Sequence, residues 1–380
     1  MSEYQRYEFM TVDRPLTKKE QEAVDALSSH IEVSATHALV EYNWGDFKHD
    51  SIDVLHKYFD GFLYWANWGS PQLAFRFPRG ILSGDLLAGY DLEDFASLTH
   101  YKDYDILNIE FGEMEAPDEW TEYDLGSLIP MREELMEGDQ RALYIVWLAT
   151  QEMMGSYDEE EEYEIDVPPI PPGMGELTGA QEELAALFRV SEELLMAAAS
   201  HSATRKASRE AADEDIAALI QLLSPERSNE YLLRLAHNEP GLSRLFLREL
   251  RELSRDKTSE TSPTGERVTY ATLLAESKTI AARLEREKRE QAEAERLRHL
   301  KDIHDHRDTY WLQVDKSAER GVASGYDEAT KLLVELRDAA TQFNEMQEFQ
   351  TRFRAWVGSH LRRPALIKRL QAQKFTIPEM

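Results

Sequence analysis

Residues 62–77 read FLYWANWGSPQLAFRF, and this stretch has the pattern of two strands joined by a turn. Two apolar runs, FLYWA (62–66) and QLAFRF (72–77), flank a five-residue connection that contains Gly69 and Pro71. Runs of aromatic and aliphatic residues on either side of such a connection are typical of a β-hairpin. The sequence therefore predicts two antiparallel strands joined by a turn.

Strand and helix patterns surround this hairpin. Asp50 or Ser51 can cap a short helix, because a small polar side chain before a helix accepts a hydrogen bond from its first turn. We predict an acidic α+β domain over residues 1–157, with a mostly antiparallel sheet and helices. The β-prone runs are 7–13, 31–42 and 104–111, and the helical patterns are 17–30, 51–59 and 138–154.

The tripeptide Asn-Trp-Gly occurs twice, at residues 43–45 and 67–69. The sequences around the two copies match over these three residues and no further, so they do not indicate an internal repeat. Gly45 and Gly69 are predicted to form turns, because glycine adopts positive φ angles without steric cost. The adjacent tryptophans are expected to pack near one end of the same sheet. Solvent-facing indoles across a shared cleft would instead indicate a ligand site.

The composition changes after residue 157. Residues 158–175 combine a run of acids with prolines and predict a linker, because like charges repel and proline favours extended geometry. Thr178-x-x-Gln181 has the pattern of a capping box and predicts the start of a helix. Ser224 followed by Pro225 predicts another helix start. We expect a helical domain over residues 176–254.

The last part of the chain is predicted to be helical and charged. A polar linker at residues 255–268 precedes a long helix and a TPR-like helical hairpin, which together fill residues 269–380. The apolar seam of the long helix ends near Leu284. Pairs four residues apart, such as Glu285 with Arg289, follow it and are typical of a solvent-bridging helix or a loose coiled coil. A coiled coil would allow self-association through residues 269–303.

The formal net charge of −29 is unevenly distributed along the chain. Residues 1–180 hold 38 acidic and 11 basic residues, whereas residues 181–380 hold 34 acidic and 32 basic ones. Such a negative field repels nucleic-acid phosphates, so we do not expect residues 1–180 to bind DNA or RNA directly. The charge instead favours protein partners with basic surfaces. Mimicry of a phosphate backbone and simple solubility are the alternatives.

The composition also excludes several classes of protein. The sequence contains no cysteine, so disulfides and cysteine-ligated zinc are excluded. No run approaches the roughly 18–20 apolar residues that cross a bilayer, and the N-terminus lacks the apolar core of a signal peptide. We therefore expect a cytoplasmic protein without membrane contact. The sequence has no phosphate loop, dinucleotide-binding glycine run or nucleophile elbow, and predicts no cofactor.

The segment WGDFKHD (44–50) places four polar side chains close together. Asp46 and His49 are candidate catalytic residues, because a carboxylate or an imidazole can act as a general base. Lys48 and Asp50 flank them. In the simpler interpretation, Asp46 belongs to the turn at Gly45 and Asp50 caps the next helix.

Arg76 and Arg79 are the cations of residues 58–101, and Arg76 alternates with phenylalanines on a predicted strand. A guanidinium group can bind a carboxylate or a phosphate with two hydrogen bonds. Arg76 is therefore a further candidate catalytic residue, and Arg79, Trp44 and Trp68 are candidate ligand-binding residues. We favour the alternative that both arginines neutralise neighbouring acids.

His299, Asp302 and His306 share one face of the predicted long helix. Metal sites use ligands at such helical spacing. However, this helix is rich in charges and has no apolar shell to orient ligands. We therefore interpret the three residues as a solvated face and predict no metal site.

Several stretches together resemble a family of uncharacterised bacterial proteins. The resemblance covers most of the chain in the same order and implies no activity and no catalytic residues. It implies a link with genes for SWIM-type zinc-finger and SNF2-type helicase proteins, and so with a DNA-linked or anti-phage defence assembly. Asn43 departs from the family's pattern in the first Trp-Gly turn. The matching stretches are YEFMTVDRPLT (7–17), WGDFKHD (44–50), LYWANWG with LAFRFPR (63–79), DQRALYIVWLA (139–149) and VPPIPPGMGELTGAQEELAALFRV (167–190).

Three functional hypotheses follow from the sequence. The leading one is a non-enzymatic interaction or scaffold protein, or an accessory subunit of a bacterial cytoplasmic multiprotein system. The second is an enzyme of unrecognised type, whose site would be a deep polar pocket lined by Trp44, Asp46, His49, Trp68 and Arg76. The third is an acidic DNA mimic that occupies a nucleic-acid site on another protein.

Overall fold

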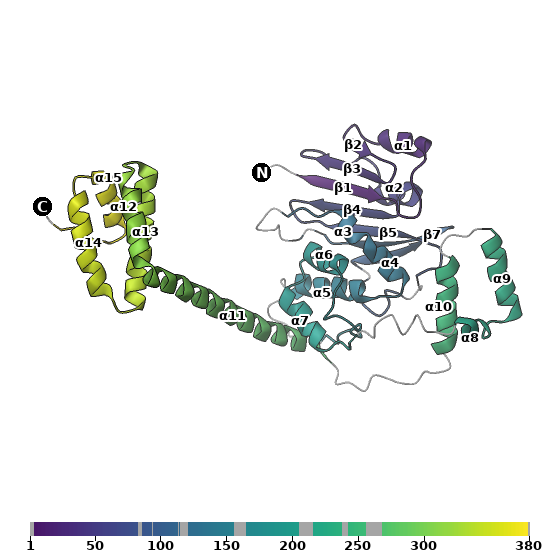
Figure 1. The fold of residues 1–380 in the computed structure, drawn as a ribbon. Helices are drawn as coiled ribbons and strands as arrows, with labels where there is room; N and C mark the ends of the chain where they lie inside the picture. Colours follow the sequence, from purple (N-terminus) through teal and green to yellow (C-terminus); the bar gives the residue numbers. More distant parts are fainter. Residues whose placement is uncertain are drawn as a thin grey trace. The chain divides into compact units, whose positions relative to one another are not determined.

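Seven strands form one antiparallel sheet in the order β2-β3-β1-β4-β5-β7-β6 (Figure 1). The structure is a computed structural model and describes residues 4–82, 86–92, 94–112, 114, 121–155, 165–204, 216–237, 242–255 and 268–378. The predicted α+β class is confirmed, and so is the hairpin, in which Leu63 pairs with Leu73. The strands are β1 (Gln5–Met10), β2 (Ile31–Val33), β3 (His37–Tyr42), β4 (Gly61–Ala66), β5 (Gln72–Pro78), β6 (Ala96–His100) and β7 (Tyr104–Glu110).

Helices α1 and α2 alternate with the first strands, and the other helices follow the last strand (Figure 1). Three predicted caps are confirmed: Asp50 accepts from the first turn of α2, Thr178 and Gln181 form the capping box of α6, and Ser224 caps α9. No described helix is both long enough and apolar enough to span a membrane. The helices are α1 (Lys18–Asp25), α2 (Ser51–Tyr58), α3 (Leu125–Leu128), α4 (Pro130–Met136), α5 (Arg141–Gly155), α6 (Gly179–Leu187), α7 (Glu192–Ser200), α8 (Ile216–Ile220), α9 (Pro225–Ala236), α10 (Leu242–Arg255), α11 (Tyr270–Asp305), α12 (Arg307–Glu319), α13 (Ala323–Gln342), α14 (Met346–His360) and α15 (Pro364–Ala372).

The sheet is buried on both faces along its central strands. Successive side chains of a strand point to opposite faces, so Phe62 of β4 packs with α1 and α2, whereas Leu63 and Trp65 pack with the core formed by α3 to α7. In β5, Arg76 alternates with Phe75 and Phe77, as predicted, and all three are buried. A buried cation in a central strand needs partners on that face.

The chain divides into two compact units, Met1–Ile280 and Ala281–Met380. The boundary predicted at residue 157 falls inside the first unit, because α6 shares a core with the sheet: the rings of Phe111 and Phe188 are 4.5 Å apart. The predicted linkers lie partly outside the described residues, at 158–164 and 256–267.

The second unit is helical and has its own aromatic core. Trp311, Phe349, Phe353 and Trp356 pack together between α12 and α14. Helices α13 and α14 form the hairpin predicted at residues 326–360. Gly325 is required where α12 meets α13, because a Cβ atom there would lie 2.4 Å from the backbone oxygen of Ser317.

Candidate functional site

Both Asn-Trp-Gly turns lie at the same end of the sheet. Gln5 at the start of β1 pairs with Tyr42 at the end of β3 and with Ala66 at the end of β4, so the two turns lie on either side of β1. The φ angles of Gly45 and Gly69 are +99° and +83°. The prediction that both glycines form turns is confirmed.

The two tryptophans differ in their surroundings. Trp44 is 69% exposed, so the prediction that it packs near one end of the sheet is wrong. Trp68 is half-buried. A turn residue has fewer neighbours than a strand residue, which leaves room for such exposure.

The polar residues of the first turn have separate partners. Asp46 accepts a hydrogen bond of 2.9 Å from the side-chain amide of Gln5. A ring nitrogen of His49 lies 3.1 Å from the carbonyl oxygen of Leu27. Asp50 caps α2, while Lys48 is exposed. These contacts hold the turn and the helix in place and agree with the simpler interpretation of WGDFKHD.

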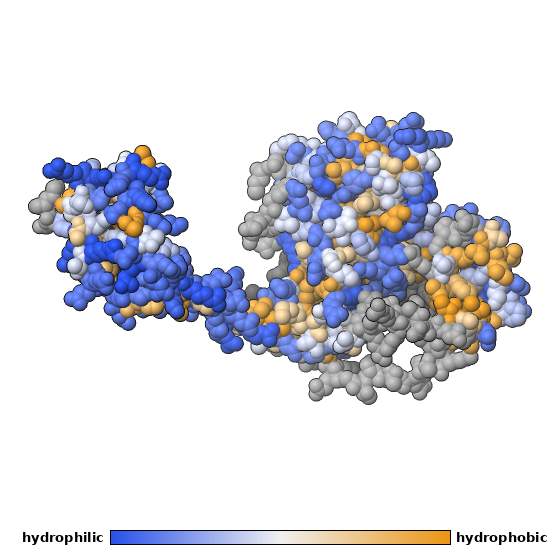
Figure 2. Space-filling model, viewed as in Figure 1, coloured by the Kyte–Doolittle hydropathy of each residue, from blue (hydrophilic) through white to orange (hydrophobic). Residues whose placement is uncertain are grey.

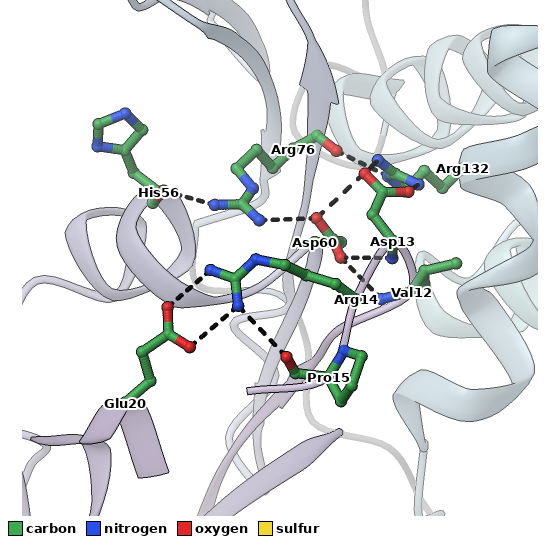
Figure 3. A network of polar contacts seen from close by, with 9 residues as sticks. All are labelled: Val12, Asp13, Arg14, Pro15, Glu20, His56, Asp60, Arg76 and Arg132. Atoms are coloured by element: carbon green, nitrogen blue, oxygen red, sulfur yellow. Dashed lines mark hydrogen bonds and ion pairs between the residues drawn. The ribbon is translucent and has the colours of Figure 1, made fainter. Parts of the chain in front are cut away.

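Arg76 belongs to a buried ion network centred on Asp60 (Figure 3). Its guanidinium donates 2.8 Å to Asp60 and 2.7 Å to the carbonyl oxygen of His56. The backbone N–H groups of Val12 and Asp13 donate to the other carboxylate oxygen of Asp60, at 2.7 and 3.0 Å. Burial alone would raise the pKa of Asp60, but the charge and hydrogen bond of Arg76 and these two N–H groups lower it below its usual value.

A second buried arginine completes the network. Arg132 of α4 donates to both oxygens of Asp13, at 3.0 and 2.7 Å, and to the carbonyl oxygen of Arg76 at 2.7 Å. Arg79 has a different partner, since it donates 2.5 Å to the buried Asp105. The two arginines predicted as candidates therefore neutralise acids, which is the interpretation favoured from the sequence.

Two of the three predicted metal candidates, Asp302 and His306, contact each other, and His299 has another partner. His299 lies 3.3 Å from Glu335, and His306 lies 3.1 Å from Asp302, which also accepts from Tyr310. Across the described residues, no group of three or more His, Asp or Glu side chains is arranged to hold a metal ion.

The described residues form a hollow in each unit. One lies in the second unit beside His304 and Trp311 and has a volume of about 30 Å³, which holds one or two waters at most. The other lies in the first unit beside the second Asn-Trp-Gly turn and has a volume of about 140 Å³. Its lining includes Trp65, Tyr123 and Arg189. None of the five residues of the predicted enzyme site lines either hollow.

Helix α9 carries the most exposed leucines among the described residues. Leu232, Leu233 and Leu235 are 62%, 63% and 64% exposed. With 3.6 residues per turn, they and Ala236 span an arc of about 160° on one side of the helix. We call this surface the leucine face. Figure 2 shows hydrophobic residues gathered over α9 and α10, at the right of the view.

Helix α9 contacts α10 through a mixed polar and aromatic edge. Arg227 donates twice to Glu249, at 2.7 Å each, and the hydroxyl of Tyr231 donates 2.5 Å to the same carboxylate. The hydrogen bonds from Arg227 lower the pKa of Glu249. The ring of Tyr231 also packs edge-on against Phe246 at 4.9 Å. Because this edge faces α10, the leucine face points away from it.

Sequence reasoning missed both the leucine face and the pocket beside Asn67. The run YLLRLA (231–236) indicates a helix but not which of its sides is covered. The pocket joins three segments that are far apart in the chain, so no local motif marks it. One signal was present: Arg189 is the only lysine or arginine between residues 142 and 204.

Comparison with known proteins finds no matching family model, no similar curated protein and no similar solved structure. The resemblance to a bacterial family thus stays a prediction, and the function has to be argued from the geometry.

Proposed function

We propose that this protein is a non-enzymatic interaction protein, and that its leucine face binds a basic amphipathic helix of a partner protein. The observation that carries the proposal is the exposure of Leu232, Leu233 and Leu235 on a helix that contacts its neighbour through Arg227 and Tyr231. Membership of a DNA-linked bacterial assembly, suggested by the family resemblance, is a further part of the proposal.

The exposure is unfavourable for the isolated chain. Full burial of a leucine side chain contributes about 1.5–3 kcal/mol, and a helix on a folded protein normally turns its apolar side to the core. A large contiguous patch of exposed apolar surface is rare on a soluble monomer and often marks an interaction site. A partner that covers three leucines would recover this free energy.

The shape and charge of the surface select the occupant. An apolar stripe along one helix is best covered by the apolar stripe of a second helix, because their side chains interlock as ridges and grooves. Exposed Glu226 and Glu230 border the stripe next to Leu233. Basic residues beside the partner's stripe would therefore be attracted, and association would slow at high salt.

Quantitative co-purification from the cells that naturally make the protein tests this proposal. The tagged full chain is compared with the double variant Leu232→Ser/Leu235→Ser. We expect at least one co-purified protein to fall about tenfold or more in the double variant, because losing two buried leucines costs more than 1.4 kcal/mol. A peptide covering a basic amphipathic helix of that protein should then bind the wild-type chain and not the variant.

The matched control is Leu312→Ser, which removes a leucine that is 60% exposed on α12 of the second unit. It should leave the co-purified proteins unchanged. The proposal is wrong if the wild-type protein is recovered alone at low salt, or if the double variant retains every partner. It is also wrong if light scattering shows a homodimer that the double variant abolishes, because the leucine face would then bind a second copy.

A further inference from the structure

We propose that the pocket beside the second Asn-Trp-Gly turn binds a small aromatic carboxylate, with Arg189 as its counter-ion. This site is separate from the leucine face, so it stands or falls independently of the interaction proposed above. The pocket lies between the β4–β5 turn, the segment that leads into α3 and the end of α6.

Within the described residues, the charge of Arg189 has no carboxylate partner, unlike the charges of the other arginines before residue 205. Seven arginines are described between residues 4 and 204, and six of them form ion pairs with carboxylates. Arg189, the seventh, is half-buried and has no ion pair or side-chain hydrogen bond within the described chain. A half-buried guanidinium gains from an anion that fits its fork of donors.

The backbone fixes the position of Arg189. Its N–H donates to the carbonyl oxygen of Ala186 at 3.2 Å, and the N–H of Val190 donates to that of Ala185 at 2.9 Å. Arg189 has a φ of +59°. These contacts form a Schellman motif at the end of α6, and its left-handed position is usually occupied by glycine. The side chain therefore leaves from a rigid turn at the pocket rather than from a free loop.

Two aromatic residues form a rigid wall of the pocket. The indole N–H of Trp65, which is 4% exposed, donates 2.9 Å to the carbonyl oxygen of Tyr123. The two rings meet edge to face, with centroids 6.0 Å apart. The hydroxyl of Tyr123 in turn donates 3.1 Å to the carbonyl oxygen of Ala186 in α6. A wall held in this way loses little conformational entropy when a ligand binds.

Size and charge define the ligand class. A cavity of about 140 Å³ is close to the roughly 150 Å³ that accommodates a benzene ring. Two acids lie near the wall: Asp124, which follows Tyr123 in the chain, and Glu183 of α6. Burial, followed by the charge of Asp124, raises the pKa of Glu183. A nearby carboxylate repels a doubly charged phosphate more strongly than a singly charged carboxylate. A ligand with one aromatic ring and one carboxylate therefore matches a pocket with one aromatic wall and one arginine.

Ligand-observed NMR and calorimetry on the full chain test the site. The probes are benzoate and phenylacetate, each paired with its neutral amide. We expect each carboxylate to bind about tenfold or more tightly than its amide, since a charge-assisted hydrogen bond contributes at least this much. In Arg189→Gly the affinity for the carboxylate should fall to that for the amide. This variant keeps the turn, because glycine is the usual residue there.

The matched control is Lys48→Gln, which removes an exposed positive charge elsewhere in the same unit. It should leave the affinity for both probes unchanged, whereas an equal loss would show that net charge alone attracts the acids. The proposal is overturned if neither carboxylate binds, if the amides bind equally well, or if Arg189→Gly binds like the wild type. Tighter binding of phenyl phosphate than of benzoate would also overturn the assigned class.

Discussion

Two arginine environments in the first unit show how the protein uses buried charge. Around Asp60, two buried arginines donate to carboxylates and carbonyl oxygens from four segments of the chain. At the end of α6, Arg189 is half-buried beside aromatic rings and has no described carboxylate partner. The charges of the first environment are paired within the protein, although Nε of Arg76 is buried without a hydrogen-bond partner. The charge of Arg189 has no carboxylate partner among the described residues.

This difference separates structural charge from charge available for binding. A buried ion network with paired charges connects elements, and in the Asp60 network these are the end of β1, the start of β4, strand β5 and helix α4. Removing one partner leaves an uncompensated charge, which is costly. Substitution of Arg189, which has no described ion pair, should cost the folded protein little stability. The two environments therefore predict mutational effects of different size and sign.

The largest effect is expected for Asp60→Ala. This substitution leaves Arg76 and Arg132 buried without the central carboxylate and frees two backbone N–H groups. Loss of one member of a buried ion pair costs about 3–5 kcal/mol. Urea denaturation followed by circular dichroism measures the change in the free energy of unfolding. Asp25→Ala, at an exposed position at the end of α1, is the control and should change it by less than about 0.5 kcal/mol.

A loss below about 1 kcal/mol in Asp60→Ala would contradict the comparison. It would show that water or local rearrangement replaces the hydrogen bonds of the two arginines. The Asp60 network would then contribute no more to stability than Arg189 does.

A smaller effect is expected when Asp60 is protonated rather than removed. Its pKa is lowered in the folded protein, so the carboxylate stabilises the fold above its unfolded pKa and this contribution is lost as the pH falls through the folded pKa. The difference in unfolding free energy between the wild type and Asp60→Asn should therefore be largest near neutral pH and shrink below about pH 4. Denaturation of both proteins between pH 7 and pH 2.5 measures it. A difference that does not depend on pH would mean that the charge of Asp60 is unimportant.

Much of the fold could be predicted from the sequence because its signals are local. The hairpin at residues 62–77 and the caps at Asp50 and Thr178 each depend on a few adjacent residues, and all are present. Strand β6 (Ala96–His100) was missed, because only Ala96 in it is buried and the strand lies at the sheet edge. Pairing with β7, rather than its own composition, makes it a strand.

The candidate sites could not be predicted for a related reason. The sequence predicted only that Arg76 has an acid nearby. It did not identify Asp60, which is 16 residues away and directly precedes strand β4. Trp44 and Trp68 share a tripeptide, yet only the fold shows that one is exposed and the other half-buried. Arg189 lies far along the chain from Trp65, and the contact between their segments depends on the packing of α6 under the sheet. Burial and partnership are properties of the fold rather than of single segments.

The smallest effect, and one of opposite sign, is expected for Arg189→Gly. Relief of the left-handed backbone strain favours the variant by about 1–2 kcal/mol, and the greater freedom of glycine in the unfolded chain offsets about 0.4–1 kcal/mol of this. The folded protein should therefore be unchanged or up to about 1.6 kcal/mol more stable. Arg189→Ala, which keeps the strain, should be less stable than Arg189→Gly. Thermal denaturation without ligand measures both. If Arg189→Gly were instead destabilised by several kcal/mol, Arg189 would hold the fold together as Arg76 does, and its charge would not be free to bind a ligand.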